Sequence, residues 1–62
     1  MNVFSIIYNL PIGTKVILQG DYPGTVHEVY GYEWFAKDAN IIFKDGGKLN
    51  INRLELIAQV LG

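Results

Sequence analysis

The sequence predicts an all-β protein, a small five-stranded barrel with one short helical turn before the last strand. β-Branched and aromatic residues gather in short runs, and Gly, Pro, Asn and Asp separate these runs. The chain has 62 residues and no cysteine, so disulfides cannot stabilise its small core. An open sheet of short strands would leave both edges unpaired, and closure into a barrel removes them. We expect one domain over residues 1–62, with residues 1–11 as an N-terminal extension and residues 12–60 as the barrel.

The first two strands are separated by a proline-glycine turn. We expect the first strand at residues 14–20 (TKVILQG), after a bend formed by Pro11 and Gly13. Residues 21–24 (DYPG) indicate a turn. The second strand is then expected from residue 25 to about residue 34.

The strongest local pattern is Asp45-Gly46-Gly47, which follows a third strand at residues 39–44 (ANIIFK). Between IIFK and KLNI, these three residues predict a tight hairpin, because positive φ angles cost glycine little. A polar loop (FAKDAN) leads into the third strand.

The C-terminal run leaves two interpretations open. Asn52 can cap a single helical turn, and apolar residues continue to Val60. Leu54 and Leu56 lie at strand spacing, whereas Leu54, Ile57 and Leu61 lie at helical spacing. The tail is therefore predicted as either a closing strand or a short helix.

Net charge and hydropathy restrict the kinds of molecule that the chain is expected to bind. Five Lys/Arg against six Asp/Glu give a net charge of −1, which argues against a protein that binds mainly by neutralising phosphates. The apolar run at residues 3–8 lacks a positive leader and a cleavage site, and no run is long enough to cross a membrane. We expect a soluble, cytoplasmic chain with no targeting segment and no membrane contact.

The order of four short motifs resembles the SH3-like barrels. These motifs are GTKV, PGTV, IIFKDGGKLNI and NRLELI, and the resemblance covers roughly residues 12–60. Within that group, Gly24-Thr25-Val26 resembles the glycine-led strand start of KOW-type modules in ribosomal and transcription-elongation proteins. The run GTKV…GTV with a late N-x-L also resembles the small photosystem I subunits that dock ferredoxin. The first resemblance implies RNA binding, and the second implies protein binding.

The aromatic stretch at residues 28–38 (EVYGYEWFAKD) can adopt two registers, because alternate residues of a strand face opposite sides. In the flat register Val26 shares one face with Glu28, Tyr30, Tyr32 and Trp34. In the other register a bulge at His27-Glu28 turns Val26 and Val29 inward, and the three aromatics form an outward row opposite Gly31. We favour the bulged register, because small barrels bend their second strand sharply. In an alternative arrangement Trp34 or Phe35 folds over the open end of the barrel and leaves only the tyrosines exposed.

The aromatic residues are also the predicted binding site. We expect a non-catalytic module that binds a protein partner or a second copy of itself, in the manner of a phage or mobile-element accessory protein. The predicted contact residues are Tyr22, Tyr30, Tyr32 and Trp34. The alternative is a nucleic-acid-binding module that stacks bases on the same aromatics. Its phosphate contacts would come from a basic rim of Lys37, Lys44, Lys48 and Arg53. A third possibility is an aromatic cage for a methylated cation.

No pattern indicates catalysis, a metal site or a cofactor. His27 is the single histidine, so no histidine pair exists, and we expect it to be a solvated strand residue. Asp21 and Asp45 stand in turn positions where their side chains serve the backbone. The other carboxylates are scattered along the chain, and no acid/base pair is apparent.

Overall fold

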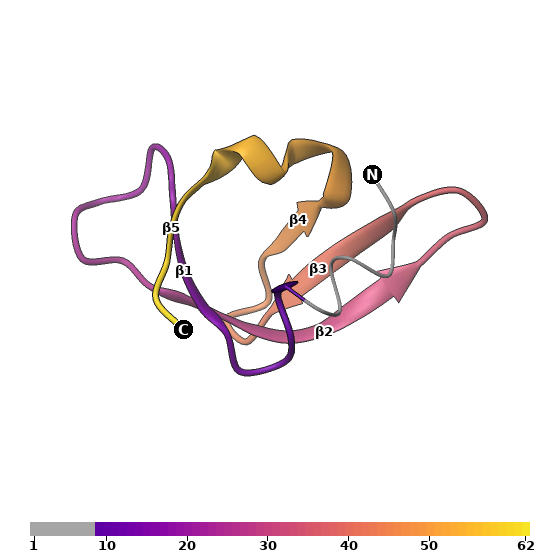
Figure 1. Cartoon of the computed structure of the whole chain (residues 1–62), viewed down its shortest axis with the longest axis horizontal. Coiled ribbons are helices and arrows are strands. Elements are labelled where there is room, and N and C mark those ends of the chain that lie inside the picture. The colour runs from indigo at the N-terminus through magenta and orange to yellow at the C-terminus, as the bar shows by residue number, and fades with distance from the viewer. Residues whose placement is uncertain (1–8) are drawn as a thin grey trace.

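The computed structural model describes residues 9–62 as five antiparallel strands in one sheet, with one short 3-10 helix (Figure 1). The elements in chain order are β1 (Lys15–Leu18), β2 (His27–Trp34), β3 (Ala39–Phe43), β4 (Lys48–Asn50), η1 (Ile51–Leu56) and β5 (Ile57–Val60). The all-β prediction is confirmed. The five strands and the helical turn before the last strand are also as expected.

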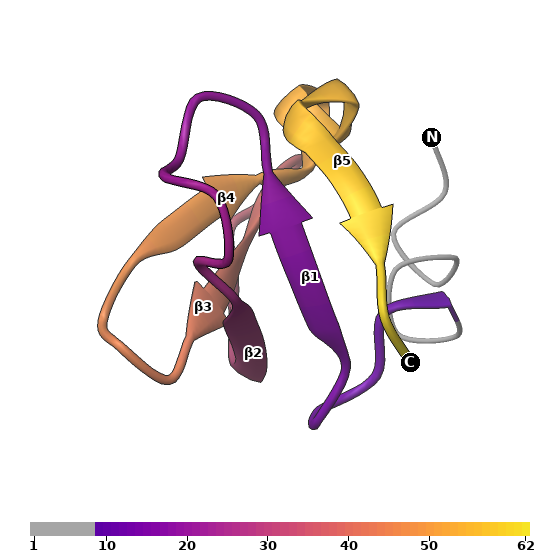
Figure 2. The same ribbon diagram turned by 90° about the vertical axis from the view of Figure 1, so that its left-hand side faces the viewer.

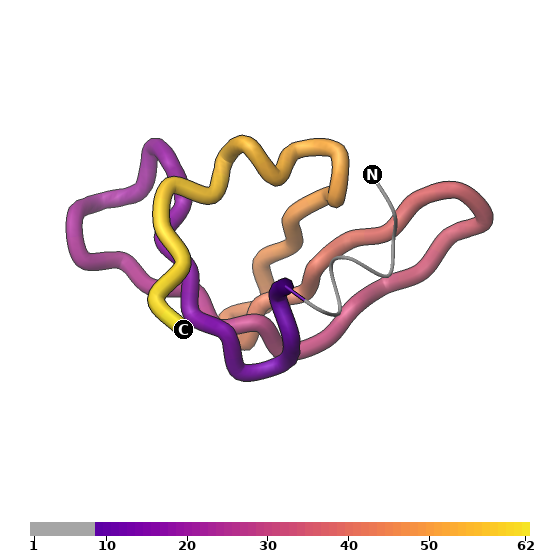
Figure 3. The backbone as a smooth tube through the Cα atoms, in the orientation of Figure 1, coloured from indigo at the N-terminus to yellow at the C-terminus, as the bar shows by residue number. Residues whose placement is uncertain are grey.

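The sheet has the order β4-β3-β2-β1-β5 and bends strongly along β2. Figure 2 shows β1 and β5 side by side, with β3 and β4 across from them. The strands β4 and β5 are the two edges of the sheet and do not pair with each other. The tube trace in Figure 3 shows η1 carrying the chain from the end of β4 across to β5.

The C-terminal run is a helix and a strand in succession. The helix η1 is capped by Asn50 rather than by the predicted Asn52, because the side-chain oxygen of Asn50 accepts a hydrogen bond from the backbone N–H of Asn52 (2.9 Å). From Ile57 the chain is extended and pairs with β1. Leu54 and Leu56, the pair at strand spacing, lie in η1, and Ile57, one of the residues at helical spacing, begins β5, so neither spacing identified the element that it suggested.

The core is formed by residues of β1 to β4 together with Leu10 and residues of η1. Three side chains are almost fully buried, those of Val16 in β1, Val29 in β2 and Ile41 in β3. The other members of the core are Leu10, Ala39, Phe43, Leu49 and Ile51. The predicted N-terminal extension lies mostly outside the described residues, but its Leu10 belongs to this core.

The β3–β4 connection is the tight hairpin that Asp45-Gly46-Gly47 predicts. Gly46 has a φ of +94°, and its N–H donates to the carbonyl of Phe43 (2.9 Å). Gly47 donates to a side-chain oxygen of Asp45 (2.8 Å). The turn is therefore held by backbone and side-chain hydrogen bonds together, and its geometry depends on a residue that tolerates positive φ.

We expect Gly46→Ala to lower the free energy of unfolding by about 1 kcal/mol, because a Cβ atom is strained at positive φ. The matched control is Gly31→Ala, where φ is not positive and a Cβ atom would meet nothing within 4 Å. That control should be neutral or slightly stabilising. Urea unfolding of both variants measures the difference, and an unchanged midpoint for Gly46→Ala would contradict the strain argument.

Candidate functional site

A β-bulge in β2 decides which aromatic side chains face the core. Val29 lies opposite Phe43, and Gly31 lies opposite the next residue, Ile42, so Tyr30 has no partner on β3. Val29 is buried, whereas the Tyr30 side chain is 66% exposed. A bulge is therefore present, but it lies at Tyr30 and not at the predicted position, His27-Glu28.

The position of the bulge places Tyr32 on the core side of the sheet. Tyr32 lies opposite Ile41, which is buried, and directly opposed residues share a face. The Tyr32 hydroxyl donates a hydrogen bond to the backbone oxygen of Leu10 (2.6 Å), and burial raises the pKa of Tyr32. The expected outward row of Tyr30, Tyr32 and Trp34 does not form, since Tyr32 packs against the core.

Two of the largest side chains remain exposed where β2 ends. Trp34 is 49% and Phe35 is 54% exposed, and the Trp34 ring lies 5.7 Å from the Tyr32 ring between centroids. A hydrogen bond from the Phe35 N–H to the carbonyl of Asp38 (2.8 Å) closes the turn that follows. We call Tyr32, Trp34 and Phe35 the hairpin-tip aromatics. Phe35 was not among the predicted contact residues.

The remaining predicted aromatic, Tyr22, lies elsewhere. It is 85% exposed in the loop between β1 and β2, and this loop lies at the opposite end of the molecule from the β2–β3 turn (Figure 1). Val26, in the same loop, is exposed as well. The expectation that Val26 points inward is therefore wrong, because β2 begins only at His27. The predicted contact residues do not form one continuous surface.

The basic residues do not gather in one rim. Lys37 precedes β3 and Lys44 follows it, so they lie at opposite ends of that strand. Lys48 pairs with Glu33 (3.1 Å) and Arg53 with Glu55 (3.5 Å). The bond from Lys48, together with one from Asn40, lowers the pKa of Glu33. Two of the four predicted cations are thus offset by neighbouring carboxylates.

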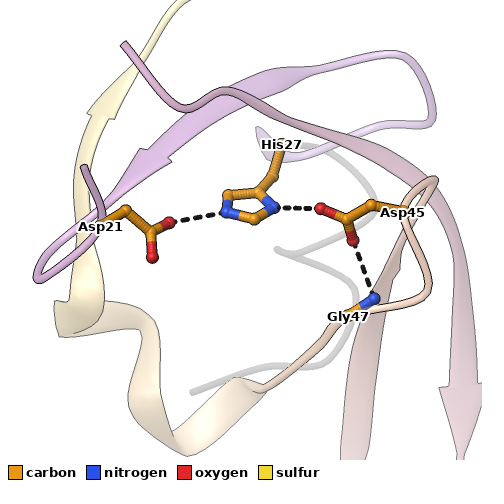
Figure 4. A network of polar contacts seen from close by, with 4 residues as sticks. All are labelled: Asp21, His27, Asp45 and Gly47. Carbon is orange, nitrogen blue, oxygen red and sulfur yellow. Dashed lines mark hydrogen bonds and ion pairs between the residues drawn. The ribbon is translucent and has the colours of Figure 1, made fainter. Parts of the chain in front are cut away.

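His27 forms a polar cluster that no pattern in the sequence predicts. Its Nε2 lies 2.7 Å from an oxygen of Asp21, and its Nδ1 lies 2.7 Å from an oxygen of Asp45 (Figure 4). The side chain is only 15% exposed, and its ring lies 5.1 Å from the ring of Phe43. The expectation of a solvated histidine is therefore wrong.

The cluster favours the charged form of the imidazole. The hydrogen bond to Asp21 raises the pKa of His27, and the bond and charge of Asp45 act in the same direction against the opposing effect of burial. The pKa of Asp45 is lowered, most by the hydrogen bond from the Gly47 N–H and next by the hydrogen bond from His27. Asp45 thus serves the hairpin turn, as its position predicted, and holds His27 as well.

From the sequence, only knowledge of how β2 pairs with β3 could have indicated that His27 lies beside Asp45. In an antiparallel pair the numbers of opposed residues have a constant sum, and Val29 opposite Phe43 extends to His27 opposite Asp45. The bond from the Lys44 N–H to the carbonyl of Glu28 (2.9 Å) continues the same register. Nothing in the local sequence around His27 indicates this pairing.

Comparisons of the chain with protein-family models, curated proteins and solved structures find no match. Within residues 9–62 there is no group of three or more His, Cys, Asp or Glu side chains placed to hold a metal ion. Over the same residues, no helix has the length and apolar character needed to cross a membrane.

We expect Tyr32→Ala to lower the free energy of unfolding by about 2 to 4 kcal/mol, because it opens a cavity beside the core and removes the hydrogen bond to Leu10. Tyr30→Ala is the matched control, since Tyr30 is exposed on the other face and such changes stay within about 0.5 kcal/mol. Chemical unfolding of both variants checks the assignment. Equal costs would mean that the bulge does not separate the two tyrosines.

Proposed function

We propose that this protein is a small SH3-like barrel that acts as a non-catalytic interaction module. The strand order and the helical turn between β4 and β5 support this architecture, because they follow the succession of strand, loop, long strand, hairpin, helical turn and closing strand. The module binds a protein partner or a second copy of itself. Its contact surface is the hairpin-tip aromatics rather than the larger aromatic set that the sequence suggested.

The half-exposed Trp34 is the observation that carries this proposal. A large aromatic side chain contributes much contact area at low entropic cost, and such residues dominate binding energies at interfaces. The ring of Trp34 lies against that of Tyr32, and Tyr32 is itself fixed by its hydrogen bond to Leu10. Trp34 is therefore positioned before binding, and less rotamer freedom is lost when a partner covers it.

A second copy of the chain is the first binding partner to test for the hairpin-tip aromatics. Residues 34–36 (Trp-Phe-Ala) form an uncharged run at the end of β2. In a two-fold symmetric contact the same patch meets itself, so an uncharged patch sets no like charges against each other. The carboxylates on either side of this run already have partners. Glu33 pairs with Lys48 (3.1 Å), and Asp38 accepts hydrogen bonds from Asn50 (3.0 Å) and Asn52 (3.4 Å).

We expect the parent protein to self-associate with rising concentration, and Trp34→Ala or Phe35→Ala to weaken this association by at least tenfold, as the loss of a central aromatic contact does. Tyr30→Ala is the matched control, because Tyr30 is also an exposed aromatic residue but lies at the bulge, away from the hairpin tip. Sedimentation equilibrium gives the dissociation constants. Fluorescence of the single tryptophan gives an independent readout, a blue shift as Trp34 becomes buried. A parent that stays monomeric, with constant emission, would contradict self-binding.

Single-stranded nucleic acid is the competing ligand, and we expect no appreciable binding at physiological salt. The carboxylates paired with Lys48 and Arg53 oppose phosphate contact. Titration of a fluorescent oligonucleotide at two salt concentrations tests this expectation. Tight binding that falls steeply with salt and is lost in Lys37→Ala or Lys44→Ala would replace the protein-binding proposal with the nucleic-acid one.

A further inference from the structure

We propose that His27 is a pH-dependent clamp that fastens the loop between β1 and β2 to the β3–β4 hairpin. The three residues of the clamp come from separate parts of the chain. Asp21 belongs to the loop, His27 is the first residue of β2, and Asp45 belongs to the hairpin turn. Figure 4 shows the imidazole between the two carboxylates, with Asp45 also held by Gly47.

The geometry requires both ring nitrogens to carry a proton. Each nitrogen lies 2.7 Å from a carboxylate oxygen, and an ionised carboxylate only accepts hydrogen bonds. A neutral imidazole has one N–H and one lone pair, so one of the two contacts would then set a lone pair against a negative oxygen. Loss of a proton from His27 must therefore break one side of the clamp.

The contact to Asp21 is the one that breaks. Asp45 is fixed independently, because its second oxygen accepts the N–H of Gly47 (2.8 Å) within the tight hairpin. The Asp21 carboxylate has no other hydrogen-bond partner among the described residues. A neutral His27 would keep its Nδ1 proton on Asp45 and release Asp21.

The loop depends on this contact. Its first residue, Gln19, is tied to η1 by hydrogen bonds to the carbonyls of Leu56 (2.7 Å) and Glu55 (3.1 Å). Beyond Gln19, the hydrogen bond from the Thr25 N–H to the carbonyl of Tyr22 (3.0 Å) joins two residues of the loop to each other and does not attach the loop to a strand. The bond between Asp21 and His27 therefore joins the middle of the loop to the rest of the sheet. Release of Asp21 frees the segment that carries the exposed Tyr22.

The direction of the pH effect follows from the charged groups around His27. The carboxylates of Asp21 and Asp45 are the charges that act on it, from the loop and the hairpin, and β3 contributes the uncharged ring of Phe43. Because they raise the pKa of His27, the clamp is complete below the ordinary value of 6.5 and opens as pH rises through the raised value. The lowered pKa of Asp45 keeps that carboxylate ionised into the acidic range.

Nuclear magnetic resonance tests the clamp directly, because the chain has one histidine and its ring titration is unambiguous. We expect the pKa of His27 to lie above 6.5. We also expect the heteronuclear NOE values of the backbone N–H groups of residues 20–22 and 24–26, which report fast backbone motion, to fall with the same midpoint as the histidine titrates. A His27 pKa at or below its ordinary value, or loop values that stay constant through the titration, would overturn the proposal.

Two variants separate the clamp from general effects of charge. Asp21→Asn should lower the pKa of His27 and leave the loop mobile at every pH. Glu55→Gln is the matched control, since it also removes one carboxylate from the surface, and it should leave both the pKa and the loop unchanged. If Asp21→Asn behaves like Glu55→Gln, Asp21 does not hold the loop and the proposal fails.

Discussion

The pairing of β2 with β3 is the constraint on which the rest of the structure depends. Val29 opposite Phe43 fixes the register at one end, and Trp34 opposite Ala39 fixes it at the other. Between them the bulge at Tyr30 changes which residues face inward, so Val29 and Tyr32 both reach the core although they are three positions apart. The same register brings His27 beside Asp45. One extra residue in one strand thus determines the core, the exposed aromatics and the polar cluster.

A chain this small uses single side chains for more than one purpose. Tyr32 packs against the core, bonds the backbone at Leu10 and lies against Trp34. Asp45 closes a turn and holds His27. Because a domain of about 60 residues buries only about 60% of its unfolded surface, few side chains are available for stability alone. The residues that stabilise this fold therefore also position the groups at its surface.

Features with a local cause were predictable from the sequence, and features with a long-range cause were not. The hairpin at Asp45-Gly46-Gly47 was found because positive φ selects glycine within the turn itself. The cap of η1 was misplaced by two residues, since both Asn50 and Asn52 suit the position. The bulge at Tyr30 and the bond between His27 and Asp45 depend on how β2 pairs with β3, and nothing in the sequence around Gly31 indicates that pairing.

The His27 clamp and the hairpin-tip aromatics lie at opposite ends of β2, and this separation limits the coupling between them. His27 begins the strand and Trp34 ends it, and all the intervening residues except the bulged Tyr30 are paired to β1 or β3. Structural coupling between two sites needs an element that has two arrangements and whose equilibrium both sites bias. A shift of register in β2 would turn Val29 and Tyr32 out of the core together, which is too costly to accompany the release of a loop. The clamp should therefore act on the loop that carries Tyr22 and leave the affinity of the hairpin-tip aromatics unaltered.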